Sequence, residues 1–112
     1  MYQIIATPTF KVTLQRLVHF LEVKYSEEKA RQISHQIKTT LTKKLAKNPE
    51  IAPLSPRLIS LGINQYRQFQ IDEHNIVFYK IIEKKKRVLL LAVMDSRQSL
   101  QKLLQEVALL SP

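Results

Sequence analysis

The sequence predicts a single α+β domain over residues 1–112, in which an antiparallel sheet packs on a helical hairpin. Apolar residues recur every three or four positions in three segments, which is typical of amphipathic helices. Four shorter segments are rich in β-branched and aromatic residues, which is typical of strands. Their order is strand, helix, helix, strand, strand, strand, helix. A length of 112 residues suits one domain of ordinary size.

The first half is predicted to form a short strand and two helices. Residues 2–6 are rich in β-formers. Thr7 and Pro8 are typical of a helix start, because threonine caps free amides and proline suits the first helical position. A second helix is expected from Ser26 to about residue 47, with Glu27 and Glu28 in the turn where the helix dipole favours negative charge. The two helices, joined at residues 25–26, would form a hairpin.

The second half is predicted to form three strands and a last helix. Residues 48–56 contain three prolines, so an irregular loop is expected there. The strands are expected at residues 65–71, 75–82 and 87–94, and their short connections indicate an antiparallel meander. Residues 2–6 must join this sheet elsewhere, because an unpaired strand leaves its backbone groups unsatisfied. Residues 99–110 have leucines at helical spacing and predict a C-terminal amphipathic helix.

The last two predicted strands are apolar on both faces. Strands of this kind are covered on both sides, either by the same chain or by the chain on one side and a partner on the other. The sequence leaves both arrangements open.

Composition narrows the class of protein. Lys and Arg outnumber Asp and Glu by 18 to 9, and the net charge of +9 favours a polyanionic partner: nucleic acid, an acidic protein or anionic lipid. The absence of cysteine removes disulfides and thiolate metal sites and fits a reducing cytoplasm. Residues 1–10 lack the pattern of a secretory signal, and the longest apolar run, residues 88–94, is too short to span a membrane. We therefore expect a cytoplasmic protein without a membrane segment.

Three short motifs in the second half carry a resemblance to a known family. Tyr66 and Arg67 open the first strand of the meander, and an Ile-Val-Phe-Tyr run at residues 76–79 follows in the next strand. After the last strand comes the segment 94–98, which contains Arg97 and Gln98. With the helical hairpin and the Asn-Pro pair at residues 48–49, the chain resembles the RelE/ParE toxin superfamily over nearly its whole length. The resemblance implies a RelE/ParE-like fold, and a cytoplasmic toxin held inactive in a hetero-oligomer with its cognate antitoxin.

The superfamily has two branches with different activities. RelE-like members cut messenger RNA on the ribosome, and ParE-like members poison DNA gyrase. Cleavage of RNA without a metal needs a general base, a general acid and cations that stabilise the phosphorane. Arg67 and Arg97 could supply cations and Tyr79 a proton-transfer group, but the sequence pattern puts none of the three histidines beside Arg97. We therefore expect a ParE-like gyrase inhibitor, with a RelE-like ribosome-dependent endoribonuclease as the alternative.

The candidate residues for binding the target or the antitoxin are aromatic and basic. Each has an ordinary structural alternative: a strand arginine on a core face must be paired, an arginine beside an aspartate forms a local salt bridge, and a basic turn is often only solvated. The candidates are Tyr66, Arg67, Lys84, Lys85, Lys86, Arg87 and Arg97.

The expected antitoxin is acidic or partly disordered, because such a segment would complement the charge of +9. It could dock by strand addition or as a helix in a groove. Operator DNA is expected to be reached only through this antitoxin. A bare DNA-binding module would need a basic groove-reading helix, and the C-terminal helix has one basic residue, Lys102. Closely spaced metal ligands are not apparent, so neither a metal nor a cofactor is expected.

Overall fold

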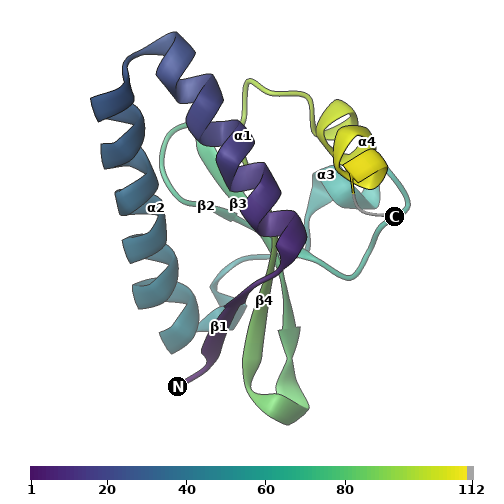
Figure 1. Ribbon diagram of the computed structural model, residues 1–112. Coiled ribbons are helices and arrows are strands. Elements are labelled where there is room, and N and C mark those ends of the chain that lie inside the picture. The colour runs from purple at the N-terminus through teal and green to yellow at the C-terminus, as the bar shows by residue number, and fades with distance from the viewer. Residues whose placement is uncertain (111–112) are drawn as a thin grey trace.

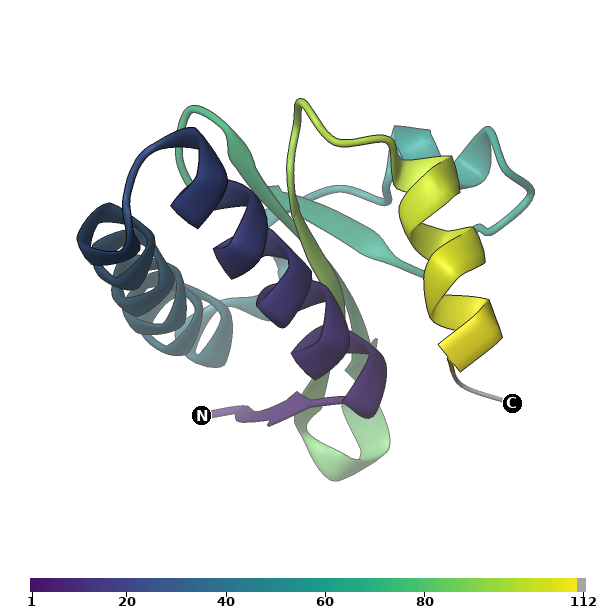
Figure 2. The same cartoon turned by 45° about the horizontal axis from the view of Figure 1, so that its top comes forward.

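The computed structural model describes the backbone of residues 1–110 and the side chains of residues 1–106. A four-stranded sheet has a long helical hairpin on one face and short helices on the other (Figures 1 and 2). The elements are β1 (Gln3–Ala6), α1 (Pro8–Lys24), α2 (Glu27–Lys47), η1 (Pro49–Ile51), α3 (Pro56–Ile59), β2 (Arg67–Gln70), β3 (Asn75–Ile82), η2 (Glu83–Lys85), β4 (Arg87–Asp95) and α4 (Leu100–Leu110).

Both helices of the hairpin begin where the sequence predicts. The Thr7 hydroxyl oxygen accepts a hydrogen bond from the amide of Phe10 at 3.1 Å, and Pro8 occupies the first turn of α1. The Ser26 hydroxyl oxygen accepts from the amide of Lys29 at 3.0 Å at the start of α2. These side chains satisfy amides that have no partner within the helix, so local chemistry alone fixes both starts.

The sheet is mixed, with the strand order β1-β4-β3-β2. Strands β2, β3 and β4 form the expected antiparallel meander. Strand β1 joins the far edge and pairs in parallel with β4, with Ile4 opposite Val88. The expectation of an antiparallel sheet is therefore wrong for β1. No turn links β1 to β4, so no local sequence signal sets its direction, whereas short turns fix the other pairs.

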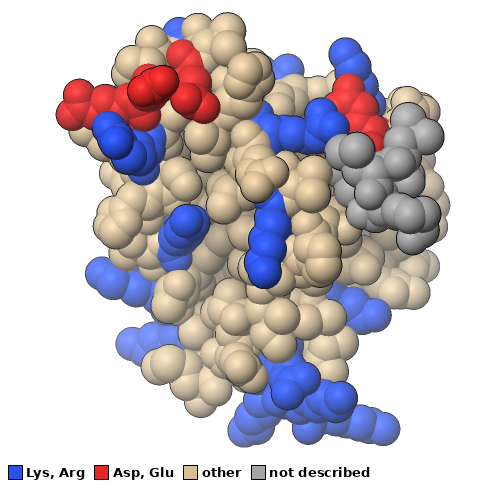
Figure 3. Space-filling view, in the orientation of Figure 1, with Lys and Arg blue, Asp and Glu red and all other residues tan. Residues whose placement is uncertain are grey.

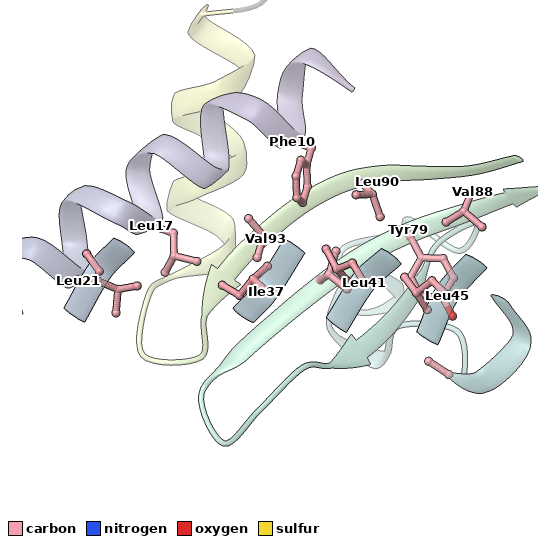
Figure 4. Packing of buried hydrophobic residues seen from close by; sticks show 13 residues of the cluster. Phe10, Leu17, Leu21, Ile37, Leu41, Leu45, Tyr79, Val88, Leu90 and Val93 are labelled. Atoms are coloured by element: carbon pink, nitrogen blue, oxygen red, sulfur yellow. The ribbon is translucent and has the colours of Figure 1, made fainter. Parts of the chain in front are cut away.

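The chain itself covers both faces of β3 and β4. On one face, Leu17 of α1 and Ile37 and Leu41 of α2 pack on strand residues that include Val77 and Val93 (Figure 4). On the other face, a second cluster joins α3 and α4 to the sheet. Its fully or nearly buried members are Leu58, Ile76, Phe78, Ala92, Met94, Leu100 and Leu103. Of the two arrangements that the sequence leaves open, the structure has cover from the same chain on both sides.

A β-bulge in β4 shifts the register of its pairing with β3. Phe78 pairs with Ala92 but Tyr79 pairs with Leu90, so Leu91 is an extra residue in β4. Because side chains alternate along a strand, one extra residue exchanges the faces beyond it. Leu90 and Val93 therefore both point toward the helical hairpin.

Residues 48–56 are more ordered than the predicted irregular loop. Pro49 and Pro56 begin the short helices η1 and α3, where a missing amide hydrogen is no loss. Between them the chain follows the outer edge of β2, because the amide of Gln68 donates to the carbonyl of Pro53 at 2.9 Å and the amide of Ser55 to that of Tyr66 at 2.8 Å. This segment covers the β2 edge. Within the described residues, no helix has the length and apolar character needed to cross a membrane.

Candidate functional site

Arg97 follows β4 directly and is held by the carboxylate of Asp95. Its Nε donates to Oδ1 of Asp95 at 2.7 Å and its Nη2 to Oδ2 at 2.5 Å. The Arg97 backbone amide donates to the same Oδ1 at 2.8 Å. The Asp95 side chain is fully buried, whereas that of Arg97 is 32% exposed. The pair is therefore a bidentate ion pair with one buried partner and one partner that reaches the surface.

Two aromatic residues of the helical hairpin also lie against Arg97. Nη1 of Arg97 donates to the hydroxyl of Tyr25 at 3.3 Å, just past the end of α1. The guanidinium carbon lies 5.8 Å from the centre of the Phe20 ring, a distance at which a cation is attracted to the ring face. Arg97 thus connects the end of β4 to the tip of the hairpin. We call Phe20, Tyr25, Asp95 and Arg97 the arginine corner.

The electrostatics of the arginine corner follow from this geometry. Burial alone would raise the pKa of Asp95. The hydrogen bonds from the side chain and backbone of Arg97, with the coulombic effects of Arg97 and His74, outweigh burial and lower it. The hydrogen bonds from Arg97 to Asp95 and Tyr25 raise the pKa of the guanidinium. Both groups are therefore charged at neutral pH.

A pocket of about 380 Å³ opens beside the arginine corner. Tyr25 and Lys29 line it from the hairpin, and His74 and Arg97 from the ends of the strands. The sequence pattern puts no histidine beside Arg97, but in the fold His74 lines the same pocket as Arg97. His74 precedes β3, and its carbonyl accepts from the amide of Ser96 at 2.6 Å, which holds the two chain segments together. Sequence reasoning missed His74 and Tyr25, since both converge on Arg97 only through the tertiary fold.

Arg67 and Tyr79 lie in a different part of the molecule. They are opposite each other on β2 and β3, on the face that the helical hairpin covers. Nη1 of Arg67 donates to the carbonyl of Ala52 at 2.6 Å, and the buried hydroxyl of Tyr79 donates to that of Pro49 at 2.6 Å. Burial raises the pKa of Tyr79. Both side chains thereby anchor residues 49–52 to the sheet, away from Arg97.

Tyr66 and the basic turn are also separate from the arginine corner. Tyr66 precedes β2 and packs against the cluster under α3 and α4. Lys84, Lys85 and Lys86 form the turn after β3, and Arg87 begins β4. Because Arg87 and Asp95 are the two ends of β4, the turn and the arginine corner lie at opposite ends of the sheet (Figure 1). The predicted binding residues therefore fall into separate regions rather than one site.

A groove of about 610 Å³ lies between α1 and α4. Its apolar lining includes Val12, Phe20 and Leu103. Arg16 of α1 and Glu106 of α4 form an ion pair at 2.5 Å that joins the two walls. Phe20 belongs to both this groove and the arginine corner, so the two surfaces are continuous along α1. Among the described residues, no group of three His, Asp or Glu side chains is arranged to hold a metal ion.

The sequence matches the family model described as "ParE toxin of type II toxin-antitoxin system, parDE" over residues 4–100. This span includes all of the sheet except Gln3, the first residue of β1, together with the helical hairpin and the arginine corner. The chain belongs to the ParE toxin family.

Two solved structures of toxin–antitoxin systems contain a chain of similar fold. A chain from the chromosomal ParDE system of P. aeruginosa superposes with a TM-score of 0.66 at 14% identity, covering 85% of this chain and 96% of that one. A chain from the RelBE2 toxin–antitoxin complex of Mycobacterium tuberculosis superposes with a TM-score of 0.62 at 17% identity, covering 84% and 96%. At these identities the likeness concerns the fold. No curated protein sequence matches the chain significantly.

Proposed function

We propose that this ParE-family chain is a cytoplasmic toxin that inhibits DNA gyrase, and that a cognate antitoxin neutralises it. The observation that carries the proposal is the match to the ParE family over residues 4–100. The geometry of the arginines supports it further. Arg97 donates two side-chain hydrogen bonds to the buried carboxylate of Asp95, and Arg67 donates to a backbone carbonyl.

Ribonuclease chemistry would use these groups differently. A cation that stabilises a phosphorane must be aimed at the developing charge when the substrate is bound. The Nε and Nη2 donors of Arg97 are already used by Asp95, and the hydroxyl of Tyr79 is buried against Pro49. A protein-binding role makes no such demand, since a preorganised arginine on an aromatic support suits a protein interface. The arginine corner is our candidate contact with gyrase.

One observation favours the RelE-like alternative. His74 shares the 380 Å³ pocket with Arg97 and Tyr25, and a histidine is the commonest general acid or base near neutral pH. In a ribosome-dependent endoribonuclease, His74 would transfer the proton and Arg97 would contact the phosphate. This alternative requires that His74 be essential for activity.

The antitoxin is proposed to occupy the groove between α1 and α4. The groove has an apolar lining, and Val23 at its end is 75% exposed. An amphipathic helix docks in such a groove by burying one apolar face. The charge of +9 favours an acidic partner segment. Because Phe20 lines the groove and also supports Arg97, an occupant would cover part of the arginine corner and could thereby block the target.

A paired assay of the purified chain tests the proposal. One arm follows DNA supercoiling by gyrase, and the other follows the integrity of messenger RNA on translating ribosomes. We expect loss of supercoiling with accumulation of cleaved DNA, while the messenger RNA stays intact. Cut messenger RNA with normal gyrase activity would overturn the proposal, and loss of that cutting in His74→Ala would then establish the alternative. A His35→Ala variant is the matched control, since His35 is exposed on α2.

A further inference from the structure

Two segments far apart in the sequence bring basic side chains to one end of the molecule. The adjacent amides of Tyr2 and Gln3, at the start of β1, donate to the carbonyl of Ala46 near the end of α2 at 2.9 Å and to the carbonyl of Lys86 in the β3–β4 turn at 3.0 Å. The end of α2 and the turn therefore both lie next to β1. We define the basic pole as Lys43, Lys44, Lys47, Lys84, Lys85, Lys86 and Arg87.

The basic pole carries a strong excess of positive charge. Its six lysines are all exposed, and the nearby carboxylates are Glu50 and Glu83. The hydroxyl of Tyr2 donates to Glu83 at 2.7 Å, which holds that carboxylate toward β1. In the view of Figure 3 the lower end, over the β3–β4 turn, shows Lys and Arg without Asp or Glu. Acidic residues gather instead at the upper left in that view, over the tip of the helical hairpin.

The turn presents its lysines in a fixed conformation. Residues Glu83–Lys85 form a 3₁₀ turn, and Lys86 follows with φ 48° and ψ 54°. This left-handed conformation costs a residue with a side chain about 1–2 kcal/mol, and glycine avoids that cost. Among the described contacts, none of the three lysine side chains of the turn, nor that of Arg87 at the start of β4, makes a hydrogen bond or an ion pair. Packing and pairing therefore do not explain why lysine occupies this position.

We propose that the basic pole binds the phosphate backbone of duplex DNA. Lysine is depleted at protein interfaces, which are enriched in aromatic residues, whereas lysine and arginine are the ordinary partners of phosphates. Residues 83–87 are all charged and include no aromatic side chain. Binding of single strands relies on bases stacked on aromatic rings. A two-stranded ribbon fits the wide major groove of B-DNA, while the deep, narrow major groove of duplex RNA excludes side chains.

This contact goes beyond the proposed function and does not depend on the identity of the enzyme that the toxin inhibits. It also differs from the expectation that DNA is reached only through the antitoxin. The contact would be independent of sequence, because charged side chains on phosphates carry no base information. Its role would be to concentrate the toxin on DNA.

The test is the affinity of the full chain for a labelled duplex DNA of random sequence, measured over a series of salt concentrations. Each phosphate contact contributes about 0.9 to the slope of log affinity against log salt. We expect Lys84→Gln/Lys85→Gln to reduce the slope by about 2. The matched control is Lys24→Gln/Arg31→Gln, which removes the same charge at the other end of the molecule and should leave the slope unchanged.

Lys86→Gly separates binding from folding. It removes one charge and relieves the left-handed strain, so we expect the melting temperature to hold or rise while the slope falls by about 1. Equal reductions of the salt slope in the basic-pole variant and in the control variant would overturn the proposal, because they would indicate a general effect of charge. Tighter binding of single-stranded RNA or of polyglutamate than of duplex DNA would also overturn it, as would the absence of DNA binding.

Discussion

Arg97 holds the buried carboxylate of Asp95 through two hydrogen bonds, of 2.7 and 2.5 Å, and at the same time reaches Tyr25 across the interface between β4 and α1. A strand end, a helix end and a surface pocket thus depend on one side chain. This relationship makes the arginine corner a structural element as well as a candidate binding surface, and the two roles can be separated by measurement.

The Asp95–Arg97 pair should contribute to stability asymmetrically. Arg97→Ala leaves a buried carboxylate without its partner, so we expect the free energy of unfolding to fall by about 1–3 kcal/mol. Asp95→Asn should cost less, because it leaves a guanidinium that already reaches solvent. The double variant should lose less than the sum of the single variants. Urea unfolding of all four proteins measures this, and strict additivity would mean that the pair contributes nothing.

The same pair predicts how stability depends on pH. The folded-state pKa of Asp95 lies below its ordinary value of 3.8, so its contribution is present above that value and is lost as pH falls through the folded pKa. The difference in unfolding free energy between the wild type and Asp95→Asn should be constant near neutral pH and shrink in strong acid. Urea titrations across this range measure the difference, and a gap that widens on acidification would contradict the assignment.

Much of the fold is readable from the sequence because local chemistry determines it. The caps at Thr7 and Ser26 and the short turns of the meander give the hairpin and three paired strands. The parallel pairing of β1 depends on contacts across more than 80 residues, and α3 has four residues, too few for a helical period to appear.

Less of the candidate site could be predicted from the sequence, because its residues are brought together by contacts between distant segments. Arg97 could be named from its place after a strand, but Tyr25 precedes it by 72 residues in the chain. His74 lines the same pocket as Arg97 only because the β2–β3 turn and the end of β4 lie side by side in the sheet. Arg67, in contrast, has the structural role given above as its alternative. It lies on the core face of β2, and its side chain is paired with the backbone carbonyl of Ala52.

Thr13 satisfies a backbone group next to the β4 bulge. Its buried hydroxyl accepts from the amide of Val93 at 3.1 Å and donates to the carbonyl of Phe10 at 2.9 Å. Thr13→Val keeps the shape but leaves the Val93 amide without a partner, and should lower the free energy of unfolding by about 1–3 kcal/mol. Thr13→Ser keeps the hydroxyl and should lose less. Chemical denaturation compares the two, and equal losses would argue against the hydrogen bond.

Tyr79 is predicted to stabilise the fold and to have no part in the toxin's activity. Tyr79→Phe removes the hydrogen bond to the carbonyl of Pro49, and should lower the free energy of unfolding by about 1–2 kcal/mol. Inhibition of the target by the folded variant should equal that of the wild type. Thermal unfolding and a target assay at low temperature measure both quantities. A stable variant without activity would return Tyr79 to the list of catalytic candidates.

The most direct test of the central claim is the supercoiling of relaxed plasmid by gyrase as purified toxin is added. Our account predicts a dose-dependent loss of supercoiling and accumulation of cleaved DNA, with the effect weakened by Tyr25→Ser, which changes an exposed residue of the arginine corner. Unchanged supercoiling at a large excess of folded toxin would contradict the claim that gyrase is the target.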